Sequence, residues 1–325
     1  MTIQRRRFLS VATAAAFMPT LPQFARAQTY PTQPVRVVVG FAAGGATDIV
    51  ARLIGRYLSD RLGQPFVIEN RVGAGGNIAT EAVTRAAPDG YTLLMAGLND
   101  AVNASLYEKL SFNFISDIAP VATVIQQPLV MVVHPSVPAK TVPEFIAYAK
   151  QNPGKINMAS PGTGTPPHLA GELFKMETGI DMLHVPYRGG APAVTDLLAG
   201  RAQVIFISEL LSLPHIKAGT LRALAETSTA RSAALPDIPT VGEFLPGYEA
   251  SFWTGIGAPH NTPVEAVEIL NKNINAALKD ADMKNRFADI GGIGMGGTTA
   301  DFKQFLISET EKWREVIKFA KIKTL

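Results

Sequence analysis

The pattern of hydrophobic and polar residues along this chain predicts alternating strands and helices. Residues 35–40 are a short β-branched run, which is typical of a buried strand. Residues 48–62 place apolar side chains on one face and arginines on the other, as an amphipathic helix does. Further strands at 65–69 and 91–96, with a helix at 78–87 between them, predict a parallel α/β sheet. Residues 97–120 are expected to form a long connection.

The second half of the chain repeats the pattern. Apolar runs predict strands separated by helices, at residues 129–133, 156–159, 182–185, 203–207 and 221–225. A further strand at 251–256 and two C-terminal helices follow. Two α/β lobes are therefore expected, joined near residues 127–129 and 248–252. We assign 28–128 plus 252–325 to the first lobe and 129–251 to the second. Such a two-strand hinge would let the lobes close over a ligand.

The N-terminus predicts export. Arg5, Arg6 and Arg7 are followed by a short apolar run and by Ala25-Arg26-Ala27, the order of a cleavable signal peptide rather than of a membrane span. The paired arginines before Phe8-Leu9 resemble a Tat signal, but Sec signals also carry arginines, so the export route stays open between the two. We expect residues 1–27 to be removed by cleavage after Ala27, which leaves a periplasmic protein that is not embedded in the membrane.

Composition excludes several kinds of function. Four of the 30 basic residues lie in the predicted signal, so 26 remain against 27 acidic residues, and no basic run marks a nucleic-acid partner. The chain has no cysteine, which excludes disulfides and thiolate chemistry. Its five histidines are scattered without metal-ligand spacing. We therefore predict neither a metal site nor a cofactor, and no catalytic residue.

Two loops of small residues carry the candidate chemistry. Residues 41–47 lead from the first strand into its helix, and residues 160–168 occupy the corresponding place in the second half. Such a turn directs backbone N–H groups at a ligand beside the positive end of a helix, which suits an anion. The alternatives also stand. Thr47 and Asp48 would simply cap the helix, Ser160 and its neighbours would form an ordinary turn, and Phe41 would be a core residue.

The order and spacing of several motifs resemble the Bug-type periplasmic receptors of tripartite tricarboxylate transporters. The first loop, FAAGGATD at 41–48, stands where this family has a PGGxxD-like loop. Further marks are Glu69-Asn70-Arg71, Asp89-Gly90-Tyr91-Thr92 and the segments 160–168, 185–189 and 214–219. The chain departs from the family at Ala43, where proline is usual, at Arg188, where lysine is common, and at 207–209, where many members carry an aspartate. The last difference leaves open which polar substituents the ligand carries.

The resemblance implies a fold, a ligand and partners. The fold is α/β and two-lobed, of the type II periplasmic-binding kind, with a mostly parallel sheet flanked by helices in each lobe. The ligand is a small di-, tri- or aromatic carboxylate held between opposed loops, and the partners are a small and a large integral-membrane transporter subunit; the receptor itself is expected to be a monomer. The predicted ligand-binding residues are Phe41, Ala42, Gly44, Gly45, Thr47, Asp48, Asn99, Ser160, Gly162, Thr163, Gly164, Thr165, Tyr187, Arg188, Gly189, Ser208 and Glu209.

Two other functions use the same features. A receptor of this fold could report ligand occupancy to a membrane sensor kinase instead of feeding a transporter. A periplasmic enzyme acting on a carboxylate would need an activated nucleophile or a metal, and the sequence shows neither a GxSxG nor a Walker A pattern. We therefore predict a receptor and not an enzyme.

Overall fold

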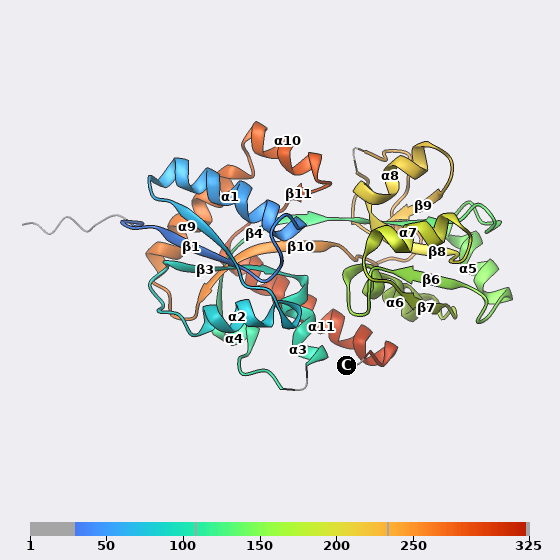
Figure 1. The fold of residues 1–325 in the computed structure, drawn as a ribbon, viewed down its shortest axis with the longest axis horizontal. Coiled ribbons are helices and arrows are strands. Elements are labelled where there is room, and N and C mark those ends of the chain that lie inside the picture. Colours follow the sequence, from blue (N-terminus) through green and yellow to red (C-terminus); the bar gives the residue numbers. More distant parts are fainter. Residues whose placement is uncertain (1–29, 108, 233, 323–325) are drawn as a thin grey trace, which may run out of the picture.

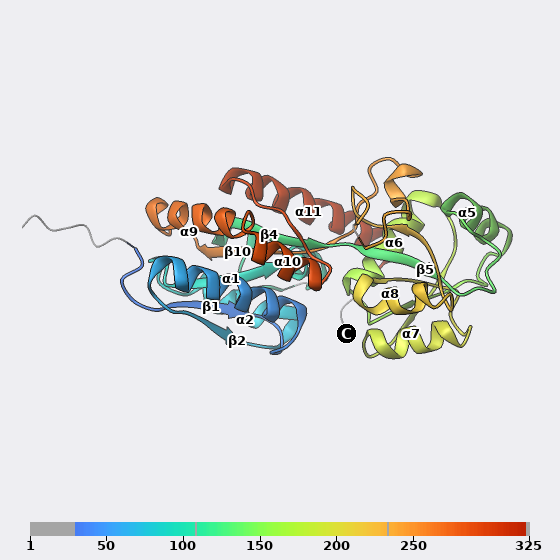
Figure 2. The ribbon, with the colours of Figure 1, turned by 90° about the horizontal axis from the view of Figure 1, so that it is seen from above.

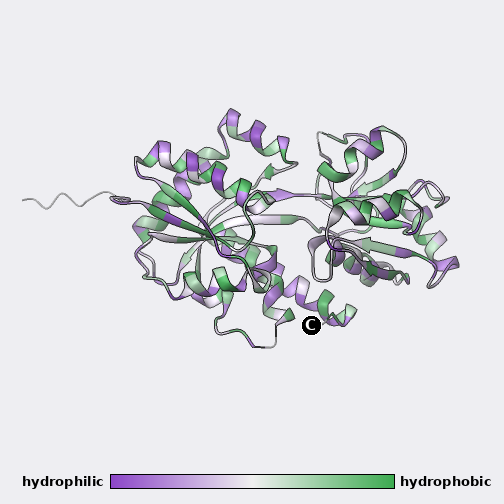
Figure 3. Ribbon diagram, in the orientation of Figure 1, coloured by the Kyte–Doolittle hydropathy of each residue, from purple (hydrophilic) through white to green (hydrophobic). Residues whose placement is uncertain are grey.

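The computed structural model describes residues 30–107, 109–232 and 234–322, so the predicted signal peptide lies outside the described residues. The chain forms two lobes, each with a β-sheet covered on both faces by helices (Figure 1). Apolar residues gather in the strands and on the inward sides of the helices (Figure 3). No helix in these three segments is both long enough and apolar enough to cross a membrane.

The first lobe contains a six-stranded sheet in the order β11-β4-β10-β3-β1-β2. Its strands are β1 (Val35–Val39), β2 (Phe66–Asn70), β3 (Thr92–Gly97), β4 (Ile118–Gln127), β10 (Phe252–Pro259) and β11 (Ile293–Gly294). Side chains of β1 alternate between two cores. Val37 and Val39 pack with one set of helices, namely α1 (Ala46–Leu62), α9 (Val264–Ala277) and α10 (Ala281–Asp289). Val38 packs with the opposite set, namely α2 (Asn77–Thr84), α3 (Leu98–Leu106) and α11 (Thr299–Ala320).

The second lobe contains a five-stranded sheet in the order β7-β6-β8-β5-β9. Its strands are β5 (Leu129–Val133), β6 (Asn157–Ser160), β7 (Leu183–Pro186), β8 (Val204–Ser208) and β9 (Arg222–Glu226). One face packs on α5 (Val142–Gln151) and α6 (Pro166–Thr178), and the other on α7 (Gly190–Leu198) and α8 (Glu209–Lys217). Two short 3₁₀ turns complete the elements, η1 (Ala74–Gly76) in the first lobe and η2 (Val241–Glu243) after β9.

The two-lobed α/β fold is confirmed, but each sheet is mixed where a mostly parallel one was expected. Strands β1, β2 and β3 are parallel, as are β6, β7 and β8. The antiparallel pairs involve the strands that carry the chain between the lobes. β4 leaves the first lobe and β10 returns to it, and because they lie side by side they must run in opposite directions. β5, which enters the second lobe, is likewise antiparallel to β8 and β9.

The two connections between the lobes lie next to each other. Phe252 pairs with Gln127 where β10 begins and β4 ends. Beyond this pair, buried Thr227 ties the two connections together. Its N–H donates to Leu129 O and its hydroxyl to Ala250 O, while it accepts from the N–H groups of Leu129 and Ala250. The hinge is therefore a pair of strands joined through one threonine, and the domain boundaries drawn around it stay a prediction.

Helix α11 adds a third link that the sequence did not predict. It packs on α3 and β4 of the first lobe and also on α6 of the second. Figure 2 shows α11 running beside β4 toward α6. At the hinge, the buried carboxylate of Glu309 accepts from the indole N–H groups of Trp253 and Trp313, at 2.8 and 2.9 Å. Lys312 pairs with Glu309 and with Glu249, which precedes β10. The helix thus fastens both lobes to the returning strand.

Residues 97–120 are not simply a long connection, because they contain α3 and the short helix α4 (Phe114–Asp117). The prediction failed because α3 is capped by Gly97 rather than by a serine or threonine. Asp100 supplies the missing cap by accepting from Gly97 N at 2.8 Å. Asn99 therefore lies in the first turn of a helix and not in a loop.

Candidate functional site

The loop after β1 is shaped from behind by Asp48. Gly44 adopts a left-handed conformation with φ of +81°, which favours glycine. Its N–H donates to Asp48 Oδ2 at 2.8 Å, and Arg52 binds both carboxylate oxygens at 2.8 and 2.9 Å. Asp48 is only 1% exposed. The helix cap is Gly45, not Thr47 or Asp48 as expected, because Asp48 lies inside the first turn of α1 and faces the loop.

Asn70, the last residue of β2, joins this network from the neighbouring strand. Its Nδ2 donates to Asp48 Oδ1 and to Phe41 O, both at 2.9 Å. Burial alone would raise the pKa of Asp48, but hydrogen bonds from Arg52, Gly44 and Asn70 outweigh it and lower this pKa to about 2. The carboxylate is therefore charged and fully engaged within its own lobe. Asp48 holds the loop, and its side chain has no oxygen left for a ligand.

The loop after β6 has the same design. Gly164 has φ of +75°, and its N–H donates to a side chain four residues on, His168 Nδ1, at 3.0 Å. Thr165 N donates to Gly162 O at 3.4 Å, as Gly45 N donates to Ala42 O at 3.3 Å in the first loop. The acceptor side chain has a charged partner four residues further on in both loops. Arg52 pairs with Asp48, and Glu172 lies 3.6 Å from His168 Nε2. The recurrence expected from the sequence is therefore present in the geometry.

The two helix starts differ in the donors they offer. The first N–H groups of a helix have no acceptor within it, so those of Ala46 and Thr47 at the start of α1 are available to an anion. In α6 the corresponding residues are Pro166 and Pro167, which have no N–H. The second loop therefore depends more on hydroxyl groups. Thr163 is exposed, whereas the Thr165 hydroxyl already donates to Gly162 O at 2.6 Å.

Two stacked histidines lie behind the second loop. Ser160 is buried, and its Oγ is 2.6 Å from His184 Nε2 and accepts from Gly162 N. The rings of His184 and His168 stack with their centres 3.6 Å apart. Burial, and secondarily the neighbouring His168, lowers the pKa of His184 to about 4. His184 is therefore neutral near pH 7. The side chain of Ser160 supports the loop from within.

The remaining predicted residues of the second lobe lie beside this loop. Tyr187 N donates to Ser160 O and Gly189 N to Pro161 O, so residues 187–189 line its flank. The Tyr187 hydroxyl donates to Asp196 Oδ2 at 2.8 Å and is therefore engaged in its own lobe. Arg188 is exposed, and no hydrogen bond or ion pair to it occurs among the described residues. Ser208 ends β8 and Glu209 follows it; because β8 is parallel to β6, both lie at the same sheet edge as the second loop.

The loop edges of the two sheets face each other (Figure 1). A Cβ placed on Gly164 would lie 3.2 Å from Leu106 Cδ1, so the end of α3 touches the loop of the second lobe. On another flank, a Cβ placed on Gly291, which follows α10, would lie 4.0 Å from Glu209 Cβ. Apart from the contact of α11 with α6, the lobes therefore approach each other at these two places, and both involve predicted site residues, Gly164 and Glu209.

Unpartnered buried polar atoms mark the same region. Within the described parts of the chain, four buried side-chain atoms have no hydrogen-bond partner: Asn77 Nδ2, Glu209 Oε1, Ser251 Oγ and Thr254 Oγ1. Asn77 begins α2, Glu209 begins α8, Ser251 precedes β10, and Thr254 pairs with the last residue of β3. All four lie at loop edges or at the hinge. Because buried polar groups are normally hydrogen-bonded, a polar ligand or ordered water is expected beside them.

The sequence analysis missed three of these residues, namely Asn77, Ser251 and Thr254. Asn77 had a visible signal, because it ends the glycine-rich run 70–77. Its Oδ1 accepts from Asn103 Nδ2, which also donates to Gly75 O, so the two asparagines shape this third loop. Ser251 and Thr254 gave no signal, since nothing local distinguishes a strand hydroxyl that faces a ligand from one that does not.

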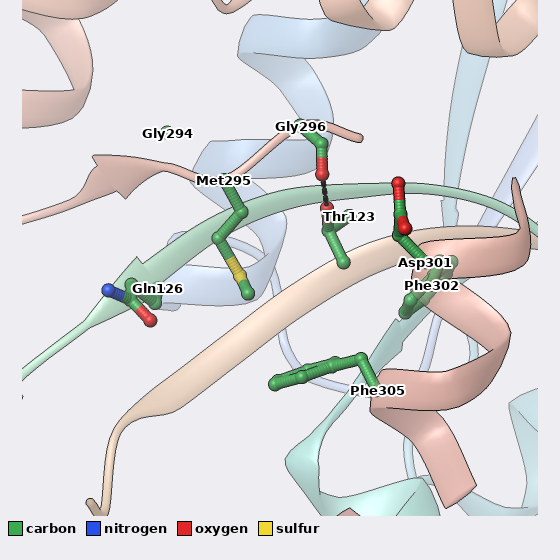
Figure 4. A pocket seen from close by; sticks show the side chains of 8 residues that line it. All are labelled: Thr123, Gln126, Gly294, Met295, Gly296, Asp301, Phe302 and Phe305. Atoms are coloured by element: carbon green, nitrogen blue, oxygen red, sulfur yellow. Dashed lines mark hydrogen bonds between the residues drawn. The ribbon is translucent and has the colours of Figure 1, made fainter. Parts of the chain in front are cut away.

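A pocket of about 340 Å³ lies away from these loops, between β4, β11 and the start of α11 (Figure 4). Met295, Phe302 and Phe305 form its apolar walls, Thr123, Gln126 and Asp301 its polar ones, and β10 and β3 separate β4 from β1. Asp301 on its rim caps α11 by accepting from Thr298. The pocket therefore has no set of converging donors such as a carboxylate requires.

Two α/β lobes joined by paired strands, with matching loops at facing edges, define the class of two-lobed solute-binding proteins. A family model described as a tripartite tricarboxylate transporter family receptor matches residues 50–322, so the chain belongs to that family. Over 311 residues it is 37% identical to Protein BugT of Bordetella pertussis, covering 95% of this chain and 94% of BugT.

Two solved structures of Rhodopseudomonas palustris proteins are similar along nearly the whole chain. Rpa4515 with adipate is 36% identical with a TM-score of 0.75, covering 91% of this chain and 100% of that one. MatC with bound malate is 32% identical with a TM-score of 0.71, covering 89% and 100%. The predicted family is therefore confirmed, and relatives of this fold hold small carboxylates.

Proposed function

We propose that this protein is a periplasmic receptor that binds a small carboxylate between its two lobes and delivers it to the integral-membrane subunits of a transporter. The observation that carries the proposal is the pair of matching loops, each with a left-handed glycine tied to a side chain four residues on. The similarity to proteins solved with adipate and malate supports the same ligand class.

In this proposal the first lobe provides most of the charge stabilisation. The N–H groups of Ala46 and Thr47 and the positive end of α1 would bind one carboxylate, directly or through an ordered water. No arginine is needed, which agrees with the engagement of Arg52 by Asp48. The second lobe would close on the same ligand with Thr163, and the lobes would move as the bodies 28–128 plus 252–325 and 129–251.

The remaining features of the proposal follow from the N-terminal sequence and from the family. The chain would be exported and cleaved after Ala27, act as a monomer, and dock in its closed form on a small and a large membrane subunit. It would need no cofactor and perform no catalysis, because binding and release complete its task.

Binding to ligand-free protein tests the proposal. Residues 28–325 would be purified, unfolded to remove any bound compound, refolded, and titrated by calorimetry with adipate, malate and the diols that correspond to them. We expect at least one acid to bind and its diol not to bind. Diols that bind as tightly as the acids, or no binding by any small carboxylate, would contradict the proposal.

A pair of glycine variants locates the site. Gly44 and Gly63 stand at opposite ends of α1 with similar left-handed φ of +81° and +71°, and neither has an atom within 4 Å of an added Cβ. Gly44→Val and Gly63→Val should therefore cost comparable backbone strain, about 1 kcal/mol each. Only Gly44→Val should weaken carboxylate binding, roughly tenfold or more, by displacing the N–H groups of the loop. Equal affinities of the two variants would exclude this loop as the site.

A further inference from the structure

Glu209 is a buried carboxylate without a partner. It is 7% exposed, it is the first residue of α8, and its Oε1 accepts no hydrogen bond from any described residue. No described lysine, arginine or histidine forms an ion pair with it. The positive end of α8 favours a negative charge there, but it does not fill the acceptor site on Oε1. A buried acceptor without a donor is costly, and more so when it is charged.

The position of Glu209 places it where the ligand is proposed to lie. β8, which ends at Ser208, is parallel to β6, which ends at Ser160 and leads into the second loop. Both strand ends therefore lie at the sheet edge that faces the first lobe. The Glu209 Cβ is 4.0 Å from a Cβ placed on Gly291 of that lobe, so the side chain leaves α8 toward the space between the lobes.

The surroundings of Glu209 are acidic rather than basic. Glu226, the last residue of β9, is fully buried and is held by the N–H and hydroxyl groups of Ser232. Burial raises the pKa of Glu226, and the negative charge of Glu209 contributes to this rise. Neither carboxylate forms an ion pair among the described residues, although Arg231, which pairs with Glu243, also interacts electrostatically with Glu226. The two carboxylates repel a further negative group and attract a donor, above all a positively charged one.

We propose that Glu209 accepts a hydrogen bond from a donor group on the ligand, so that the receptor selects carboxylates that also carry an ammonium or, more weakly, a hydroxyl group. This inference rests on the proposed function, because it takes the carboxylate to be bound by the loop at Gly44. It narrows the ligand class. A saturated dicarboxylate without such a donor would place its second charge beside Glu209 and should bind poorly.

Matched ligands test the inference on refolded residues 28–325. Two sets of ligands would be titrated, and the members of each set have the same chain length. The six-carbon set is aminohexanoate, hydroxyhexanoate, hexanoate and adipate, and the four-carbon set is aminobutyrate, hydroxybutyrate, butyrate and succinate. We expect the amino acid to bind about 10- to 100-fold more tightly than the dicarboxylate in at least one set, the range expected for a charge-assisted hydrogen bond, with the hydroxy acid between them. A preference for the dicarboxylate or the unsubstituted acid in both sets would overturn the inference while leaving the proposed function intact. No binding by any acid would overturn both.

Glu209→Gln shows whether this side chain causes the preference. The glutamine has the same shape but no charge, so it should remove the preference for the amino acid and strengthen dicarboxylate binding. Glu144→Gln is the control, because Glu144 also lies in the first turn of a helix of the second lobe but is exposed. The unliganded Glu209→Gln protein should unfold at a higher temperature than wild type, since a buried unpaired charge is gone. If it does not fold, Glu209→Asp should keep the order of preference. An unchanged preference in Glu209→Gln would refute the role of Glu209.

Discussion

Replacing Asp48 with asparagine removes the negative charge around which the first loop folds while keeping the size of the side chain. The carboxylate accepts from Gly44 N, from two nitrogens of Arg52 and from Asn70 Nδ2. An asparagine has one oxygen and one NH₂ group in the same space. In either orientation its NH₂ must therefore face a nitrogen of Arg52 together with either Gly44 N or Asn70 Nδ2, and at least one hydrogen bond is replaced by a clash of donors.

The size of the effect follows from the pKa of Asp48. The environment lowers it from 3.8 to about 2, and each pKa unit corresponds to about 1.4 kcal/mol. The full value overstates the interaction, because the Arg52 side chain is 53% exposed and water screens the pair. We expect a loss of about 1–2 kcal/mol in the free energy of unfolding. At roughly 2–4 °C per kcal/mol for a chain of this size, the unfolding temperature should fall by about 2–8 °C.

Thermal unfolding of Asp48→Asn and of Asp282→Asn would measure this loss. Asp282 pairs with Arg286 with the same four-residue spacing, but the pair lies on the outside of α10 and the Asp282 side chain is 71% exposed. The control should change stability by less than about 0.5 kcal/mol. Because the pKa of Asp48 is lowered in the folded state, its contribution is present above pH 4 and is lost as the pH falls toward 2. The difference between wild type and Asp48→Asn should shrink over that interval.

The same variants connect stability to binding. Asp48→Asn should weaken binding of whichever carboxylate the receptor takes, because Gly44 is no longer held, whereas Asp282→Asn should bind it as wild type does. The reasoning would be refuted if the two variants lost equal stability, or if Asp48→Asn bound the ligand with unchanged affinity.

Two further predictions concern the rest of the network. His184 has its pKa lowered to about 4 by burial and then by His168, so an unfolded chain takes up a proton that the folded chain rejects between pH 6.5 and 4. As the pH falls from 6.5 to 4, the unfolding temperature of the wild type should fall by an amount equivalent to about 1–2 kcal/mol, allowing for partial exposure of the ring. The fall should be smaller in His184→Asn. If the unfolding temperatures of both proteins depended on pH in the same way, this histidine would not be the cause. Glu309→Ala leaves the indole of Trp253 without its acceptor in the core and should cost about 3 kcal/mol by calorimetry. Glu311→Ala, on the exposed face of the same helix, should cost less than about 0.5 kcal/mol, and equal losses would contradict the anchoring role of Glu309.

A local sequence pattern predicts a strand or helix well when the pattern depends on that element alone. The spacing of apolar residues predicts β1 and α1 because a strand and an amphipathic helix each bury one repeating set of positions. The glycines of the two loops can be identified from sequence for the same reason, because only the local backbone conformation requires glycine there. The mixed sheets were not predictable in this way. The direction of β4 against β10 depends on where the chain crosses between lobes, which no short window of sequence contains.

In the candidate site, too, some residues can be identified from local sequence and others depend on tertiary contacts. Gly44 and Gly164 are identified from sequence, but the roles of Asp48 and Ser160 are not. Whether Asp48 faces a ligand or its own loop depends on Asn70, which lies 22 residues away on another strand. Ser160 turns inward because His184, 24 residues on, meets its hydroxyl. Sequence therefore locates the loops, and tertiary contacts decide which of their atoms remain available to a ligand.

The link formed by α11 limits how the lobes can close. Two strands alone would allow both bending and twisting at the hinge. Because α11 packs on α3 and on α6, and Lys312 pairs with Glu249 beside the returning strand, a closure that kept these contacts would have to rotate about an axis near the helix. Such a rotation moves the lobes least beside α11 and most on the far side, where Glu209 lies near Gly291. The proposed selectivity of Glu209 would then be applied late, as the lobes close, after the loop at Gly44 has bound the carboxylate.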